Sequence, residues 1–151
     1  TGAAATGSPS PAACPPAGLR IEAGERDAAS GLRVMTIMMR NCGSVPRPVT
    51  GYPSVTVLDA KLQPVTITVH QGSSITLAVK DPGPRSFTLQ PGHATTATLA
   101  WRNTVLAGDG DPATGEHLLI APTEGAEAQL VTARLDVGNT ETIDITAWTA
   151  S

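Results

Sequence analysis

Alternation of apolar and polar residues is the sequence feature that most constrains this chain. In the segment PVTITVH, Val65, Ile67 and Val69 alternate with Thr66 and Thr68, which gives a strand one apolar and one polar face. Similar runs recur along most of the chain, whereas the spacing of an amphipathic helix does not. The pattern predicts an all-β fold without substantial helix.

Proline and glycine separate these runs. The chain has 13 prolines and 15 glycines, residue types that favour turns. We predict strands in 31–41, 54–59, 64–70, 116–122, 129–137 and 141–149, and two more within 86–101 around a Pro-Gly turn. About eight or nine strands at such spacing predict an antiparallel β-sandwich, with a barrel as the alternative.

Three local expectations follow from the same runs. Residues 31–41 are apolar on both faces, which is typical of a central strand. The runs 54–59 and 64–70 are close enough to form a hairpin. Residues 73–80 fit a strand, but Asp-Pro-Gly-Pro-Arg follows directly, so the alternative is a mobile excursion over the whole of 73–85.

The first 16 residues differ in composition from the remainder. They are rich in Thr, Ala, Gly, Ser and Pro, and such a composition buries too little surface to order itself. We predict a flexible tether over 1–16, downstream of a removed export signal, and a single sandwich domain over 17–151. No apolar run has the length of a membrane helix.

Charge excludes one class of function. Only 15% of the residues are charged and the formal net charge is -3, so no basic surface for nucleic acid is expected.

The chain has two cysteines, Cys14 and Cys42. In an exported chain, two cysteines are first interpreted as a pair. We therefore predict a disulfide that joins the end of the tether to the end of the 31–41 strand. Closing this loop would stabilise the fold by about 3.5 kcal/mol.

Four segments in order resemble a known family. They are MRNCGSVPRPVTGYPSVTVLD, TLQPGHATTATLAWRNT, HLLIAPTEG and LDVGNTETIDITAW, within residues 14–150. The chain resembles the actinobacterial exported domain catalogued as domain of unknown function 4232. The resemblance implies a secreted or lipid-anchored protein with an immunoglobulin-like sandwich, and it assigns no activity. Many relatives have a cysteine where this chain has Arg47.

No catalytic motif stands out. Cys42-Gly43-Ser44 follows a strand and lacks the setting that lowers a thiol pKa, so a disulfide is the favoured interpretation of Cys42. Ser73 and Ser74 lack the strand-to-helix turn of a serine hydrolase. We expect no catalytic residue and no cofactor.

Metal binding is the sharpest alternative. A copper carrier would use soft thioether and imidazole ligands, and this chain offers Met35, Met38, Met39, His70, His93 and His117. Met38 faces away from Met35 and Met39 on a strand, so core packing is favoured. Asp109, Asp111 and Glu116 depart from the spacing of an EF-hand calcium loop, and a solvated turn is favoured there.

Aromatic residues are the candidate partner-binding groups. Tyr52, Trp101 and Trp148 each offer a ring for stacking, although a buried corner tyrosine and core tryptophans are the more common roles. The sequence thus predicts a monomeric extracellular or cell-envelope binding module, secreted or lipid-anchored as a lipoprotein, whose partner is an envelope or extracellular protein or a glycan. The alternatives are a copper-binding protein and a secreted enzyme or enzyme inhibitor.

Overall fold

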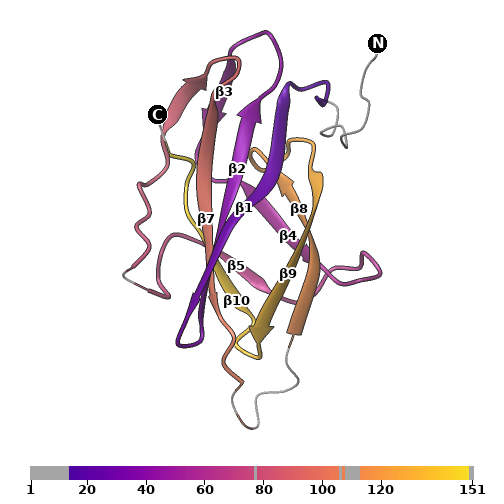
Figure 1. Ribbon diagram of the computed structural model, residues 1–151, viewed down its shortest axis with the longest axis vertical. Coiled ribbons are helices and arrows are strands. Elements are labelled where there is room, and N and C mark those ends of the chain that lie inside the picture. The colour runs from indigo at the N-terminus through magenta and orange to yellow at the C-terminus, as the bar shows by residue number, and fades with distance from the viewer. Residues whose placement is uncertain (1–13, 77, 106, 108–112, 150–151) are drawn as a thin grey trace.

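The structure is a computed structural model that describes residues 14–149 apart from 77, 106 and 108–112 (Figure 1). This part of the chain forms ten strands, which are β1 (Leu19–Ala29), β2 (Leu32–Asn41), β3 (Arg47–Thr50), β4 (Ser54–Leu58), β5 (Thr68–Gln71), β6 (Ser86–Leu89), β7 (Ala94–Arg102), β8 (Ala113–Ala121), β9 (Gln129–Gly138) and β10 (Thr142–Ile145). The same residues include no helix, and hence none long and apolar enough to span a membrane. The predicted all-β, sandwich-like fold is confirmed.

The strands form three sheets. The largest has the order β1-β2-β7-β10-β5, the second the order β4-β8-β9, and the third pairs β3 with β6. The two larger sheets pack through one hydrophobic core, and β3 lies toward the end of the molecule that is uppermost in Figure 1. All pairings are antiparallel except that of β5 with β10.

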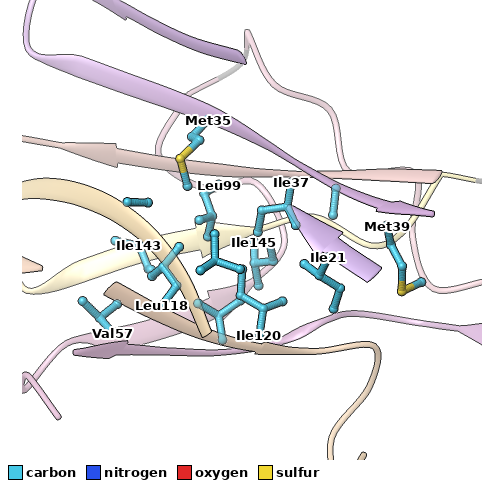
Figure 2. Close-up of a cluster of buried hydrophobic side chains, with 14 of the residues drawn as sticks. Ile21, Met35, Ile37, Met39, Val57, Leu99, Leu118, Ile120, Ile143 and Ile145 are labelled. Carbon is cyan, nitrogen blue, oxygen red and sulfur yellow. The ribbon is translucent and has the colours of Figure 1, made fainter. Parts of the chain in front are cut away.

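Strand β2 occupies the predicted inner position, between β1 and β7. Its core face carries Met35, Ile37 and Met39, all with no exposed surface. These side chains point toward Leu118 and Ile120 of the opposite sheet (Figure 2). Burying each such side chain contributes about 1.5–3 kcal/mol relative to leaving it in water. The core therefore holds β2 in place from one face.

Strand β1 was not predicted, because its second half lacks apolar–polar alternation and contains Glu25, Arg26 and Asp27 in succession. Its first half places Leu19 and Ile21 in the core, and every residue from Ala23 onward is exposed. The ladder to β2 nevertheless continues to Ala29, so cross-strand backbone bonds define this strand where side-chain alternation fails. Strand β3 was also missed, and the described part of the chain has ten strands where eight or nine were expected.

The predicted hairpin of 54–59 with 64–70 is wrong. The turn forms, since the Asp59 carboxylate accepts bonds from the backbone N–H groups of Lys61 and Gln63. A single bridge joins Leu58 to Pro64, and the chain then crosses to the other sheet, where β5 pairs with β10 in parallel. Period-2 alternation specifies a strand and its faces but not its neighbour, which explains the error.

The Pro-Gly turn near residue 91 is confirmed. Gly92 has a φ of 83°, and the His93 N–H donates to the Gln90 carbonyl at 3.0 Å, as in a type II turn. The strands on either side, β6 and β7, lie in different sheets. The turn therefore moves the chain from the β3–β6 pair into the large sheet.

Candidate functional site

Asp144 of β10 is a buried carboxylate with several donors. Its relative exposure is 1%, and its oxygens accept bonds from the backbone N–H groups of Ser74 at 2.7 Å and Ile75 at 2.8 Å. The Ser74 hydroxyl adds a bond at 3.0 Å, and His70 Nδ1 lies 3.1 Å away. Because an ionised carboxylate only accepts, Nδ1 is assigned as the donor. Asp144 thereby fastens the segment after β5 to the large sheet.

These side chains are the types found in serine hydrolases, but their order differs. A hydrolytic serine contacts the imidazole, which in turn contacts the carboxylate. Here both Ser74 and His70 contact Asp144, and no hydrogen bond joins Ser74 to His70 among the described residues. The Ser74 hydroxyl donates to the carboxylate instead of to the imidazole that serves as the base in a serine hydrolase. The arrangement holds a loop in place rather than activating a nucleophile.

A second carboxylate fastens the far end of the same segment. The Tyr52 hydroxyl donates to Asp81 Oδ2 at 2.5 Å, while Asp81 Oδ1 accepts from the backbone N–H groups of Gly83 at 3.0 Å and Ala147 at 3.1 Å. Residues 73–80 form no strand among their described members, and the two carboxylates explain how this segment lies against β10.

The Tyr52–Asp81 contact changes both acidities. The bond to Asp81, with burial and the carboxylate charge, raises the pKa of Tyr52 to about 12. Burial pushes the pKa of Asp81 upward, but bonds from Tyr52, Ala147 and Gly83 outweigh it, so the net pKa is lowered. The tyrosine bonds a side-chain carboxylate rather than the backbone group expected at a sandwich corner.

The aromatic candidates for partner binding are not equally accessible. Trp101 and Trp148 have no exposed surface, and their ring nitrogens donate to Asp136 and to the Pro122 carbonyl. Tyr52 is half-buried. The two tryptophans therefore pack in the core and present no ring face to a ligand.

The candidate copper ligands are scattered. Met35 and Met39 are fully buried in the core, and Met38 is half-buried on the opposite face of β2. The histidines lie apart in the fold, with His70 in β5, His93 in the turn before β7 and His117 in β8. No three His, Cys, Asp or Glu residues of the described part are placed to hold a metal ion. Asp109 and Asp111 of the calcium candidate lie outside the described residues.

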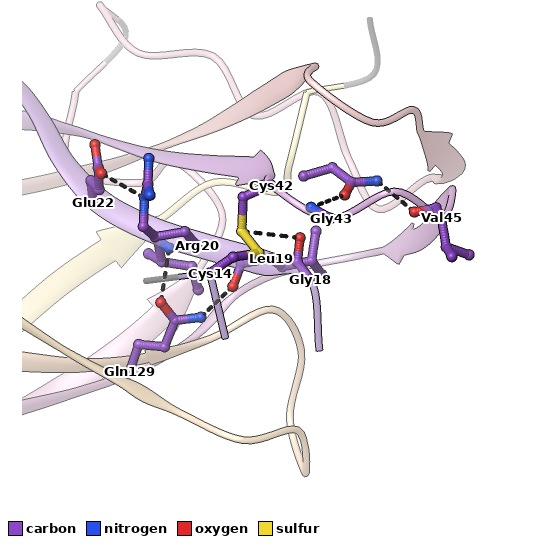
Figure 3. The surroundings of a disulfide bond; sticks show 11 residues. Cys14, Gly18, Leu19, Arg20, Glu22, Cys42, Gly43, Val45 and Gln129 are labelled. Carbon is purple, nitrogen blue, oxygen red and sulfur yellow. Dashed lines mark hydrogen bonds and ion pairs between the residues drawn. A yellow bond between two sulfur atoms is a disulfide. The ribbon is translucent and has the colours of Figure 1, made fainter. Parts of the chain in front are cut away.

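The predicted disulfide between Cys14 and Cys42 is present, with the two Cα atoms 5.7 Å apart (Figure 3). It joins the segment before β1 to the residue that follows β2. The Gln129 side chain of β9 bonds the nearby backbone edge of β1. Its amide nitrogen donates to the Leu19 carbonyl at 2.6 Å, and its amide oxygen accepts from the Ile21 N–H at 3.0 Å. Neither cysteine is free, so neither supplies a thiol nucleophile.

A groove at the other end of β1 is the largest hollow of the three described. Its volume is about 560 Å³, against about 140 and 170 Å³ for the other two. It is lined by Arg26, Asp27, Ala28, Arg33, Arg134 and Asp136, and is called here the arginine groove. Strands β1, β2 and β9 contribute these residues, so the groove spans both larger sheets.

Asp136 is the electrostatic centre of the arginine groove. Its carboxylate accepts from Trp101 Nε1 at 3.3 Å and from Arg33 Nε at 3.2 Å. Burial raises its pKa, but bonds from its own backbone and from Trp101, together with the charge of Arg33, outweigh burial and lower it overall. The groove therefore has one carboxylate already occupied by neighbouring donors.

Sequence reasoning missed Arg33, Arg26 and Asp144 as residues of interest. One signal was present, because Arg33 has the same strand parity as Met35 and Ile37 and is thus a charge on an apolar face. Asp144 stands between Ile143 and Ile145, and only the parallel pairing with β5 reveals what it contacts.

Comparison with known proteins identifies the family of this chain. The sequence matches the family described as Domain of unknown function (DUF4232) over residues 14–149. The chain belongs to this DUF4232 family. The match covers β1 to β10 and both cysteines, so the arginine groove and the disulfide lie inside the family domain. No curated protein matches the chain.

Solved structures give only a weak likeness to this DUF4232 domain. Two structures of β-glucosidase from Kluyveromyces marxianus, one in complex with glucose and one Se-Met labelled, are 8% and 11% identical, with TM-scores of 0.37 and 0.38. They cover 78% and 85% of this chain, whereas the chain spans 14% of either enzyme. A likeness at this level carries no argument about the fold or activity of the domain.

Proposed function

We propose that this domain is an exported, cell-envelope binding module without catalytic activity. The observation that carries the proposal is the arginine groove, an open hollow between the edges of two sheets with charged side chains already held by the protein. Binding needs a surface of fixed geometry with unsatisfied groups, and this groove has both. The resemblance to exported DUF4232 proteins motivates the compartment.

Two further observations support the proposal. The disulfide is a bond that persists in oxidising compartments, in keeping with an exported domain. The Ser74, Asp144 and His70 cluster has no contact between nucleophile and base, which speaks against hydrolysis at this loop.

The test combines binding with turnover. Purified domain is sedimented with isolated actinobacterial envelopes over a concentration series, with reduced and unfolded domain as the control. We expect saturable retention of the folded domain only. In parallel, a panel of hydrolase substrates is assayed with the wild type, Ser74→Ala and His70→Ala. Turnover that disappears in either variant, or retention no greater than that of the control, contradicts the proposal.

A further inference from the structure

Strand β1 contains a bulge directly before the residues that it contributes to the arginine groove. Ala23 pairs with Ile37 and Arg26 pairs with Met35, so two residues on β1, Gly24 and Glu25, stand opposite one on β2. An added Cβ at Gly24 would lie 3.1 Å from the Thr36 carbonyl oxygen, so the backbones approach closely here. Bulges of this kind re-aim the side chains that follow them.

The re-aimed side chain is Arg26. Residues opposite one another in an antiparallel pair point to the same face, and Met35 points into the core. Arg26 therefore points to the core side of the large sheet, where its guanidinium lies 5.7 Å from the Trp101 ring centre. Arg33 shares this face, since it pairs with Ala28 one step further along. The inner face of the sheet thus ends in two arginines.

The charges lining the groove do not balance. Three guanidinium groups face two carboxylates, and this local excess of positive charge occurs in a chain with a formal net charge of -3. One carboxylate, Asp136, is already bonded by Trp101 and Arg33. The other, Asp27, accepts a bond from the Ala28 N–H at 2.8 Å.

The three arginines differ in how many donors remain. Each nitrogen of the Arg33 guanidinium has a partner, because they donate to Asp136, to the Leu32 carbonyl at 3.3 Å and to the Asn103 side-chain oxygen at 2.7 Å. One nitrogen of the Arg26 guanidinium donates a hydrogen bond to the Arg134 carbonyl at 2.5 Å. The Arg134 guanidinium makes no ion pair or hydrogen bond with the described residues. Arg26 and Arg134 therefore retain N–H donors without an acceptor among the described residues.

We propose that the arginine groove binds an oxyanion, a carboxylate or phosphate group carried by a ligand chain, through Arg26 and Arg134. Guanidinium groups match planar carboxylates and phosphates with paired N–H donors. Trp101 lies buried beneath Arg26, so the groove offers no exposed ring on which a neutral sugar stacks. The acidic group is consequently the recognised feature. This inference deepens the proposed binding function and rests on it.

Titration calorimetry with defined anions tests the site. The probes are poly-L-glutamate for carboxylate, polyphosphate for chain phosphate, inorganic phosphate for the free ion and neutral dextran as the blank. The variants are Arg134→Gln and Arg26→Gln, with Arg85→Gln as the matched control, because Arg85 is exposed and lies outside the groove. Thermal melting confirms that each variant is folded, and Arg134→Gln alone suffices if Arg26→Gln is not.

We expect saturable binding of at least one anionic polymer, weakened about tenfold or more by Arg134→Gln and unchanged by Arg85→Gln. Binding of inorganic phosphate alone, with the same dependence on Arg134, assigns the site to a free ion and removes the ligand chain from the proposal. Absence of binding to every anion overturns the proposal, as does equal weakening by Arg134→Gln and Arg85→Gln.

The envelope assay separates the two proposals. If Arg134→Gln abolishes anion binding and envelope retention together, both proposals are supported and the same site serves both kinds of binding. If envelope retention survives in Arg134→Gln while no anion binds, the domain is a binding module that uses another surface, and only the oxyanion site fails. If the wild type is not retained by envelopes but binds anions through Arg134, the binding site stands and the envelope role fails.

Discussion

The two ends of β1 meet β9 in contrasting ways. At the disulfide end, around Leu19 and Ile21, the core is apolar and the neutral amide of Gln129 bonds the strand edge. At the groove end, Arg26 reaches across to the Arg134 carbonyl and charged side chains face one another over an open hollow. Both ends close an otherwise unpaired strand edge, which limits edge-to-edge association. Among the described residues, Arg26 and Arg134 at the groove end retain N–H donors, which the proposed ligand would use.

The largest expected effect is removal of the disulfide. Replacing Cys14 and Cys42 together by alanine should lower the free energy of unfolding by about 3.5 kcal/mol, because the unfolded chain regains the freedom of a loop with a sequence separation of 28 residues. Denaturant titration measures the change. Anion binding by the remaining folded protein should be unaltered. A loss below about 1 kcal/mol would show that the disulfide end is held mainly by packing.

Gln129→Ala should weaken the same end by about 1–3 kcal/mol, since the Ile21 N–H and the Leu19 carbonyl both lose their amide partner. Gln63→Ala is the matched control, because Gln63 is exposed and its hydrogen bonds in the turn come from its backbone. The free energies of unfolding of the two variants are compared in urea. Equal free energies of unfolding for the two variants would show that the Gln129 hydrogen bonds do not stabilise the contact between β1 and β9.

Lowering the pH should destabilise the groove end of β1 more than the disulfide end. The pKa of Asp136 is lowered in the folded protein from 3.8, so its contribution to stability is present above that value and is lost as the pH falls through the folded-state pKa. The stability difference between wild type and Asp136→Asn should therefore shrink on going from about pH 7 to about pH 3. Urea unfolding across this range measures it. A difference that stays constant or grows toward acid contradicts the assignment.

The smallest effect concerns Tyr52, which lies away from the contact between β1 and β9 and serves as a reference. Tyr52 is the one tyrosine of the sequence, so ultraviolet absorbance reports its ionisation alone. We expect a midpoint at about pH 12, unchanged in Arg134→Gln and lowered toward 10.0 in Asp81→Asn. Because the folded-state pKa is raised, the associated stability is present below pH 10.0 and lost as the pH rises to about 12.

Circular dichroism recorded through the same titration verifies that the protein stays folded. A wild-type midpoint near 10.0 in folded protein would mean that the Tyr52–Asp81 bond does not form in solution. A shift caused by Arg134→Gln would mean that the groove and the Tyr52 region are coupled.

Sequence alone predicted the elements whose information is local. The apolar faces of β2, the turn at Gly92 and the pairing of the two cysteines are confirmed. Strand β1 was missed because cross-strand backbone bonds, rather than side-chain pattern, maintain its charged half. The hairpin of 54–59 with 64–70 was wrong because alternation does not encode which neighbour a strand chooses.

The arginine groove could not be predicted from local sequence pattern either, because its residues come from strands that are distant in the chain. Arg33 stood out in principle as a charge with core parity, but Arg134 lies about a hundred residues away and meets Arg26 only across two sheets. The bulge at Gly24 and Glu25 depends on register, which one strand does not show by itself.

The amino-acid sequence by itself determined that the chain is β-rich, that residues 31–41 form an inner strand and that its two cysteines form one bridge. Alternation, turn residues and the number of cysteines can be recognised without the tertiary structure. Tertiary structure decided that β5 pairs with β10, that Trp101 is buried under Arg26 and that three arginines converge between two sheets. These features depend on contacts between segments distant in the chain, and such contacts form only when the sheets pack around their shared core.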